Sequence, residues 1–278
     1  MGYYSLWPLP GSLRCIYGLG HYRGQSGDYS VQDHDREIIM LVQTQAIVLS
    51  ALKYGDADLI VHALTRDHGV KHYMLRGVRK SRKGKLRVSY FQTLTQLEIE
   101  AYHKNKGTLE RIKETRLAYT YQTLHTDVVK STLSLFLAEV LQQVIKEEVP
   151  DQELFDYISG SLIWLDQHEQ IANFHIFFLL QMTAFLGFYP DFSNKEGNYF
   201  DLLQGRFQDE AMGDYIRSGP EIEGLKEYFG IDFDRLSDIS QPKNQRLEIL
   251  DLLLTYYQLH LQQFKKPRSL PVLIELFN

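Results

Sequence analysis

The spacing of apolar residues changes once along the chain, and this change constrains the fold more than any other feature. Between residues 41 and 120 the apolar residues form short runs or alternate, most clearly where glutamates separate Leu97, Ile99 and Ala101. A two-residue period is typical of half-buried strands. Between residues 125 and 278 apolar residues recur at three- and four-residue intervals, as in amphipathic helices. We therefore predict a multidomain protein, with a β domain at 40–122 and an all-α domain at 123–278.

The β domain contains five segments with strand character and no helix-length pattern between them. Turn residues separate the segments, including Gly69 and Gly107. Five short strands of this kind predict a small closed barrel with the strand count of an OB-fold. The predicted strands are 42–52, 59–64, 70–75, 90–102 and 109–117.

The α domain contains four segments with helical periodicity. Pro150 and Pro190 lie at segment boundaries, where proline commonly ends a helix. Residues 191–207 are polar and rich in turn formers, so we expect a loop or a short hairpin there. The predicted helices are 133–145, 153–168, 171–187 and 244–264.

Residues 1–39 differ from the rest of the chain. They carry no periodic pattern and lack the basic and apolar regions of a signal peptide. We interpret them as a flexible leader or as the result of an upstream start assignment, with Met40 as the natural start. We assign no function to them.

Charge is distributed unevenly along the sequence. The whole chain has a net charge of −5, but residues 40–125 have a net charge of +8 and residues 126–278 a net charge of −12. A basic half beside an acidic half is typical of a nucleic-acid-binding module joined to another module. The single cysteine, Cys15, excludes an internal disulfide and a zinc site built from cysteines, and it fits a reducing cytoplasm. No apolar run approaches the ~20 residues that a membrane span requires.

The strongest local signal is a basic run between the third and fourth predicted strands, residues 76–87. Seven of its twelve residues are Lys or Arg and none is acidic. Exposed clusters of this kind attract phosphate backbones and release counterions on binding. A solvated loop without a ligand is the alternative. We predict that DNA contacts Arg76, Arg79, Lys80, Arg82, Lys83, Lys85 and Arg87.

Aromatic residues beside this run favour nucleic acid over a solvated loop. Tyr73, Tyr90 and Phe91 flank the basic residues, and aromatic faces stack on unpaired bases. We predict base stacking for some of these three rings and expect the others to belong to the barrel core. Lys104 and Lys106 lie at a predicted hairpin tip, where loops frame the binding groove of OB-folds. They complete the predicted DNA-binding set, although lysine is also common at hairpin tips.

Signatures of catalysis are absent from the sequence. It contains no phosphate-binding Gly-rich loop and no Gly-x-Ser-x-Gly nucleophile turn. His168 and His175 have no second ligand cluster near them in the sequence, so we predict no metal site and no cofactor. The sequence therefore favours binding over an enzyme.

Several segments, taken in order, resemble the RecO family of DNA repair and recombination mediators. The amino-terminal match is a strand, a Tyr-Gly-Asp-x-Asp turn, a strand, a Thr…His-Gly turn and a basic Gly-x-Arg loop. The last helix and tail, Arg246 to Leu273, are similar as well. The segments that carry the resemblance are Ala46–Leu49, Lys53–Val61, Leu64–Thr65, His68–Gly69, Arg76–Lys80, Phe91–Glu98 and Arg246–Leu273.

The chain departs from the family pattern in one region. Many members carry two Cys-x-x-Cys pairs after a Gly-Phe/Leu-x-Pro turn, but residues 188–208 of this chain contain no cysteine. We expect a degenerate zinc module that is held by packing alone. The candidate apolar substitutes are Tyr199, Phe200, Leu202, Leu203 and Phe207.

The resemblance implies a non-catalytic role in DNA repair and homologous recombination. It implies an OB-fold that binds single- and double-stranded DNA and anneals strands, in the cytoplasm and associated with the nucleoid. The implied partners are RecR, the carboxyl tail of single-strand-binding protein and, indirectly, RecA during its loading. Two alternatives remain: an RNA-binding OB module in translation or ribosome assembly, and a protein-interaction adaptor.

Overall fold

The computed structural model describes residues 39–80, 86–104, 109–146 and 149–276. All of them belong to one unit of the chain, Ile38–Asn278. Residues 1–38, which make up nearly all of the predicted leader, lie outside the described residues. None of the helices described in these ranges is both long enough and apolar enough to cross a membrane.

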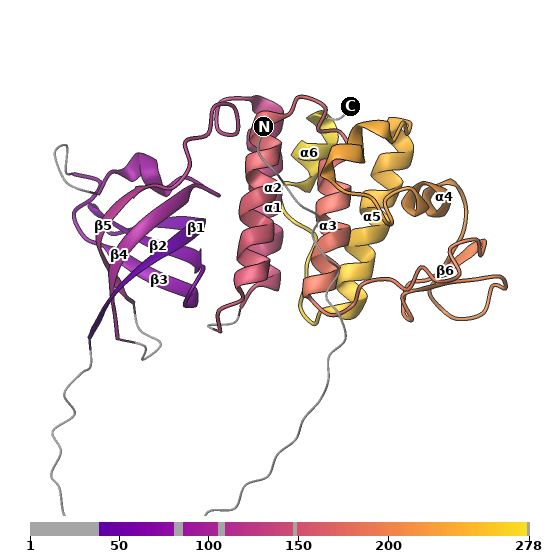
Figure 1. Cartoon of the computed structure of the whole chain (residues 1–278), viewed down its shortest axis with the longest axis horizontal. Helices are drawn as coiled ribbons and strands as arrows, with labels where there is room; N and C mark the ends of the chain where they lie inside the picture. The colour runs from indigo at the N-terminus through magenta and orange to yellow at the C-terminus, as the bar shows by residue number, and fades with distance from the viewer. Residues whose placement is uncertain (1–38, 81–85, 105–108, 147–148, 277–278) are drawn as a thin grey trace, which may run out of the picture. The chain divides into compact units, whose positions relative to one another are not determined.

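Five antiparallel strands form the amino-terminal half, in the order β3-β2-β1-β4-β5 (Figure 1). Four of the five predicted strands are confirmed with ends shifted by a few residues, because alternating and β-branched sequence is a strong local signal. The bounds are β1 Met40–Tyr54, β2 Asp58–Thr65, β3 Gly69–Leu75, β4 Gln96–His103 and β5 Arg111–Leu117.

The predicted strand 90–102 is wrong in its first half. Residues Val88–Phe91 form a 3-10 helix, and Leu94 adopts a left-handed φ of 61° before β4 begins. The cause is the backbone of β1, which forms two hydrogen bonds with this segment. The Val48 carbonyl accepts a hydrogen bond from Leu94 N at 2.7 Å, and Val48 N donates to the Thr95 carbonyl at 3.0 Å. Strand pairing thus starts only after this turn.

The sheet curls into a barrel of OB type that remains partly open. Its edge strands, β3 and β5, meet at one parallel bridge between Tyr73 and Glu110. Two backbone hydrogen bonds hold the bridge, Met74 N to the Glu110 carbonyl at 2.9 Å and Glu110 N to the His72 carbonyl at 2.7 Å. The expected closed barrel is therefore corrected to a partly open one, which is common for this fold.

Strand alternation gives the barrel an inner and an outer face. The inner face packs into one buried cluster that includes Val48, Val61, Tyr73 and Leu97. Part of the outer face packs against the helices instead and joins their core. The outer residues that do so are Ile47, Leu49, Leu64 and Val70.

The carboxyl-terminal half is mainly helical, and all four predicted helices are confirmed. The side chains of Asp127 and Asp151 cap the first two by accepting hydrogen bonds from Lys130 N and Leu154 N. Three short helical segments were not predicted, because they contain too few turns to show a period. The bounds are α1 Val128–Val144, α2 Gln152–Gln167, α3 Phe174–Phe185, α4 Pro220–Lys226, η2 Phe233–Asp238, α5 Lys243–His260 and α6 Leu270–Leu276.

The region of the predicted degenerate zinc module is a small three-stranded sheet, which we call the mini-sheet. It consists of β6 Tyr199–Asp201, β7 Arg206–Gln208 and β8 Ile216–Arg217, in the order β7-β6-β8. Phe200 and Phe207 are buried with ring centroids 4.8 Å apart. Leu202 is buried too, but Leu203, one of the predicted substitutes, is 49% exposed.

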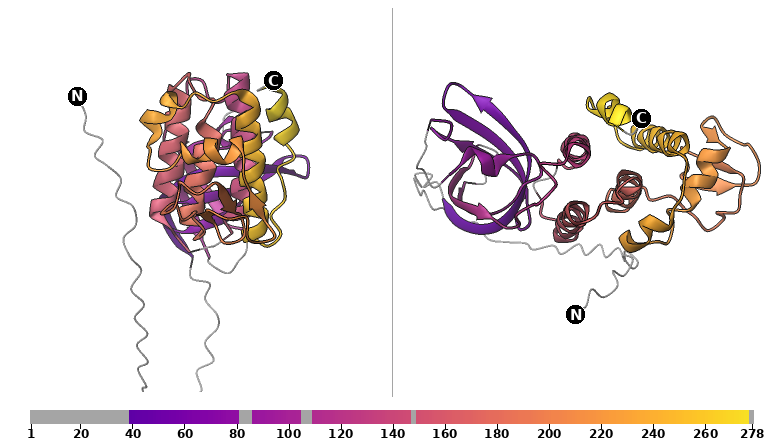
Figure 2. Two further views of the ribbon diagram at one scale, coloured as in Figure 1. Left: turned by 90° about the vertical axis from the view of Figure 1, so that its right-hand side faces the viewer. Right: turned by 90° about the horizontal axis from the view of Figure 1, so that it is seen from above.

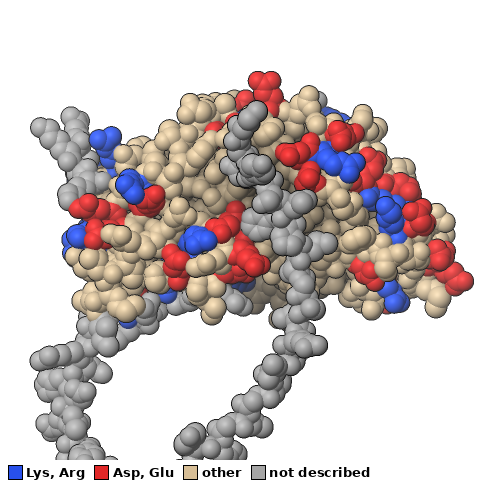
Figure 3. Space-filling model, in the orientation of Figure 1, with Lys and Arg blue, Asp and Glu red and all other residues tan. Residues whose placement is uncertain are grey.

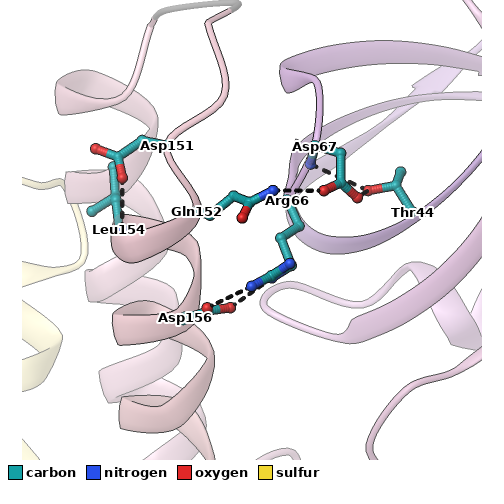
Figure 4. A network of polar contacts seen from close by, with 7 residues as sticks. All are labelled: Thr44, Arg66, Asp67, Asp151, Gln152, Leu154 and Asp156. Carbon is teal, nitrogen blue, oxygen red and sulfur yellow. Dashed lines mark hydrogen bonds and ion pairs between the residues drawn. The ribbon is translucent and has the colours of Figure 1, made fainter.

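Polar contacts join the barrel to α2 at the turn between β2 and β3 (Figure 4). Arg66 donates to both carboxylate oxygens of Asp156 at 2.8 Å. Gln152 donates to Asp67 at 2.9 Å, and the other Asp67 oxygen accepts from Thr44 at 2.7 Å. These contacts lie at the surface, beside the apolar contact between the outer barrel face and the helices.

The linker between barrel and helices is fixed by a single buried carboxylate, Asp166. It accepts hydrogen bonds from the backbone N–H groups of Gln122, Thr123 and Leu124 at 2.8–3.1 Å. The Lys130 ammonium group bonds the Thr123 hydroxyl at 2.7 Å and the Asp166 carbonyl at 2.8 Å. The linker is therefore held to both α1 and α2.

Candidate nucleic-acid interface

The outer side of β1, β2 and β3 is covered by helices over only half of its length. In the uncovered half, the register places Leu52 opposite Ile60, Ile60 opposite Met74, and His62 opposite His72. Leu52 is 56% exposed and Tyr54, two residues further along the same face, is 55% exposed. We call this surface the open face; it consists of Leu52, Tyr54, Ile60, His62, His72 and Met74.

The basic loop begins at the edge of the open face, and its first residues are held in place. Gly77 N donates to the Asp58 carboxylate at 2.7 Å, and Arg79 N donates to the Ala57 carbonyl at 3.0 Å. Between them the Val78 side chain is buried in the barrel core. Gly77 has a φ of 67°, which favours glycine at this turn. The first residues of the loop are thus fixed beside the β1–β2 turn.

Most of the described cations of the predicted set lie on the surface. Arg76, Arg79, Lys80 and Arg87 are exposed. The Arg79 guanidinium donates to the Gly55 and Asp56 carbonyls, both at 3.2 Å. Lys104, at the other predicted loop, is half-buried, and its backbone N–H bonds Glu110 at 2.8 Å. The predicted residues Arg82, Lys83, Lys85 and Lys106 lie outside the described residues.

Unlike these cations, several other cations of the barrel form ion pairs. Arg66, Lys113 and Arg116 pair with the carboxylates of Asp156, Glu100 and Glu98. Among the described residues, no carboxylate pairs with the side chains of Arg76, Arg79, Lys80 or Arg87. Lys53 at the end of β1 shares this property and was missed by the sequence prediction, because an isolated lysine carries no pattern.

Two of the three predicted stacking residues lie inside the barrel. Tyr73 is fully buried, with its hydroxyl 2.9 Å from His103 Nε2, and Phe91 is only 3% exposed. Burial, followed by the Glu110 carboxylate, raises the pKa of Tyr73. These two rings are therefore the ones that fill the core, as expected for part of the set, and they are not available for stacking. Tyr90 is half-buried, and the Arg87 guanidinium lies 5.9 Å from its ring centroid, within cation–π range.

Flat side chains are present on the open face, where the sequence prediction did not place them. Tyr54 ends β1, and the His62 and His72 rings lie 4.0 Å apart between centroids across β2 and β3. Burial, and then the neighbouring His72, lower the pKa of His62. Side chains alternate between the two faces of a strand. Once the residues of the inner face are known, this two-residue period identifies the residues of the open face.

The geometry combines two kinds of group that bind a nucleic acid strand. Cations without acidic partners surround the β1–β2 turn, and uncharged flat or apolar side chains cover the adjoining open face. Single-stranded nucleic acids bind such surfaces through phosphate contacts and base stacking. No group of three or more His, Cys, Asp or Glu that fits a metal ion occurs among the described residues.

The fold defines a class: proteins in which an OB-type barrel is joined by a short linker to a helical domain. Family models agree with both halves of the chain. The model described as Recombination protein O N terminal matches residues 40–121, and the one described as Recombination protein O C terminal matches residues 125–270.

Curated relatives match over their full length. The DNA repair protein RecO of Christiangramia forsetii is 48% identical over 239 residues, 86% of this chain and 100% of the relative. Those of Flavobacterium psychrophilum and Bacteroides fragilis are 42% and 34% identical, with the same coverage of both chains. The chain belongs to the RecO family of DNA repair and recombination proteins.

Proposed function

We propose that this protein is a non-catalytic DNA-binding mediator of repair and recombination. In this role it binds single- and double-stranded DNA, anneals complementary strands and, together with RecR, assists the loading of RecA. The observation that carries the proposal is the group of cations without acidic partners beside the open face. Membership in the RecO family supports the same role.

The cations at the β1–β2 turn bind the phosphate backbone. Arg76, Arg79 and Lys80 surround the turn, and Lys53 lies on the strand that leads into it. Each phosphate contact releases counterions, so binding is strongest at low salt and weakens as salt rises. Because these contacts do not depend on the bases, they serve single strands and duplexes alike.

The open face gives single strands an additional contact. Bases that stack on Tyr54 or on the His62–His72 pair lose contact with water but keep their hydrogen-bonding edges exposed. A second, complementary strand then pairs with those edges. The duplex that forms stacks on itself, leaves the open face and retains only its phosphate contacts. Annealing follows from this order of events without a covalent step.

The helical domain is the proposed site for protein partners. It carries the excess of acidic residues in the chain, and Figure 3 shows acidic side chains spread over this part of the face that it draws. Its proposed partners are RecR, the carboxyl tail of single-strand-binding protein and, through them, RecA. The proposed location is the cytoplasm, at the nucleoid.

The test compares the protein with the triple variant Arg76→Ala/Arg79→Ala/Lys80→Ala, using fluorescence anisotropy of a labelled single strand in a salt series. If all three side chains contact phosphates, affinity falls roughly 10²-fold at about 0.1 M salt, and the salt slope decreases by about 2. The control, Lys113→Ala/Arg116→Ala, removes cations that already pair with carboxylates and retains affinity.

Three outcomes contradict the proposal. If the affinity of the triple variant is unchanged, the cations at the β1–β2 turn do not bind the strand. A marked preference for RNA over DNA of the same sequence favours an RNA-binding module instead. Absence of oligonucleotide binding at low salt favours a protein-interaction adaptor.

A further inference from the structure

The helical domain presents a second group of cations, on the segment that joins α5 to α6. Lys265, Lys266 and Arg268 are all exposed there, in the half of the chain that is otherwise acidic. The Lys266 ammonium pairs with the Asp251 carboxylate. Lys265 and Arg268 have no acidic partner among the described residues. Two free cations therefore lie within four residues of each other.

The backbone of this segment is fixed on α1. The Gln143 side chain bonds both sides of Lys265: it accepts from Lys265 N at 2.8 Å and donates to the Lys265 carbonyl at 3.0 Å. The Glu139 carboxylate accepts from Ser269 N at 3.1 Å. Phe264, Pro267 and Ser269 are buried. These buried residues direct the lysines and the arginine outward from a rigid backbone, which is the arrangement of a preformed binding segment.

The same turn of α1 contacts the barrel strand that leads into the open face. The Gln142 side chain donates to the Leu49 carbonyl of β1 at 3.0 Å. Leu49 precedes Ser50, which lies opposite His62 of the open face. Figure 2 shows α1 between the barrel and α6, and α1 contacts both β1 and α6. The cationic segment and β1, the strand that leads into the open face, thus contact the same turn of α1.

We propose that Lys265 and Arg268 form a second anchor for the phosphate backbone of a single strand that is seated on the open face. The strand passes from the β1–β2 turn along the open face and over the last turn of α1 to this segment. Arg268 offers a planar fork that suits a phosphate, and Lys265 adds a point charge. This inference rests on the proposed function, because it extends the path of the same strand.

The first test is the variant Lys265→Ala/Arg268→Ala of the full chain, measured against two oligonucleotide lengths. A strand of about 8 nucleotides fits one OB-fold, whereas one of about 30 nucleotides extends beyond it. We expect affinity for the long strand to fall about 25-fold at about 0.1 M salt, with a salt slope smaller by about 1.4. Affinity for the short strand stays unchanged. An unchanged melting temperature shows that the exposed side chains do not contribute to folding.

The matched control removes two exposed cations at the mini-sheet, Lys195→Ala/Arg217→Ala, and so changes the net charge equally. It retains wild-type affinity for both lengths. If the control loses as much affinity as the test variant, bulk charge explains the effect and the anchor is refuted. Unchanged affinity of the test variant for the long strand refutes it as well. Absence of short-strand binding by the wild-type protein refutes the proposed function itself.

A gain of affinity provides the second test. The substitution Asp251→Asn releases the Lys266 ammonium from its ion pair and removes a negative charge from the segment. We expect affinity for the long strand to rise about 5-fold at about 0.1 M salt, as one added phosphate contact predicts. A purely structural role of the segment predicts no gain, so unchanged or weaker binding contradicts the anchor.

Discussion

Asp166 offers the sharpest test of how the barrel is attached to the helices, because one carboxylate holds three backbone N–H groups of the linker. Burial raises the pKa of this carboxyl, but the bonds from Gln122, Thr123 and Leu124 outweigh that effect, so its pKa lies below its usual range. The substitution Asp166→Asn keeps the shape of the side chain and removes its charge. Its remaining oxygen can still accept from Thr123 N and Leu124 N, but its amide NH₂ replaces the oxygen Oδ2 that faces Gln122 N and cannot accept that hydrogen bond.

The expected loss follows from the three bonds. Hydrogen bonds to a charged group contribute about 1.5–3 kcal/mol each, compared with about 1 kcal/mol for a neutral pair. Losing the charge-assisted part of three bonds lowers the free energy of unfolding by about 2–4 kcal/mol. For domains of this size each kcal/mol shifts the melting temperature by about 2–4 °C. Asp166→Asn should therefore melt roughly 4–16 °C below the wild-type protein at neutral pH.

The pH dependence distinguishes this carboxylate from an ordinary buried polar group. A carboxyl with a lowered folded-state pKa stabilises the protein fully above its unfolded pKa, about 3.9, and loses that contribution as the pH falls through the folded value. Melting curves measured by circular dichroism from pH 7 down to pH 3 should thus show the difference between wild type and Asp166→Asn narrowing below about pH 4. A difference of the same size at both ends of this range would falsify the charge argument.

Three further predictions concern other parts of the protein. Single-strand affinity should rise as the pH falls below about 6.5, because His62 gains charge on protonation; burial lowers the pKa of His62, so the rise lies on the acidic side of that value, and His62→Asn should flatten the profile in anisotropy titrations. Gly205→Ala should destabilise the fold by about 1–3 kcal/mol in thermal melts, since Gly205 has a φ of 64° and an added Cβ would lie within contact distance of the Tyr256 hydroxyl; an unchanged melt would contradict this. Phe200→Ala should lower the free energy of unfolding by about 3–5 kcal/mol, because aromatic packing holds the mini-sheet. For the same reason a metal chelator should leave the melting temperature unchanged; a drop in melting temperature with the chelator would show a bound metal.

Local sequence patterns were sufficient for most of the fold. Strands β1, β2, β3 and β5 and the four long helices repeat their characteristic period several times, so neighbouring residues specify each element. The start of β4 was misplaced because the turn at Leu94 depends on the backbone of Val48, a residue far away in the sequence. The short segments α4, η2 and α6 were missed because one or two turns contain no repeat.

The candidate site was predicted only in part, for the same reason. A run of cations is visible in the sequence, and Arg76, Arg79, Lys80 and Arg87 are exposed as expected. Nothing in the sequence shows which aromatic rings face inward. Tyr73 and Phe91 fill the barrel, whereas the flat residues on the surface belong to the opposite side of the same strands.

The sequence by itself determined the order of the elements, the switch from strands to helices, the charge of each half and the resemblance to the RecO family. Each of these depends on residues that are close in the chain. Only the tertiary structure decided which half of the outer barrel face the helices cover and which half is left open. It also decided that the segment of Lys265 and Arg268, far from the basic loop in sequence, bonds to the same turn of α1 that contacts β1. Such placements arise from packing between distant segments, and no local pattern encodes them.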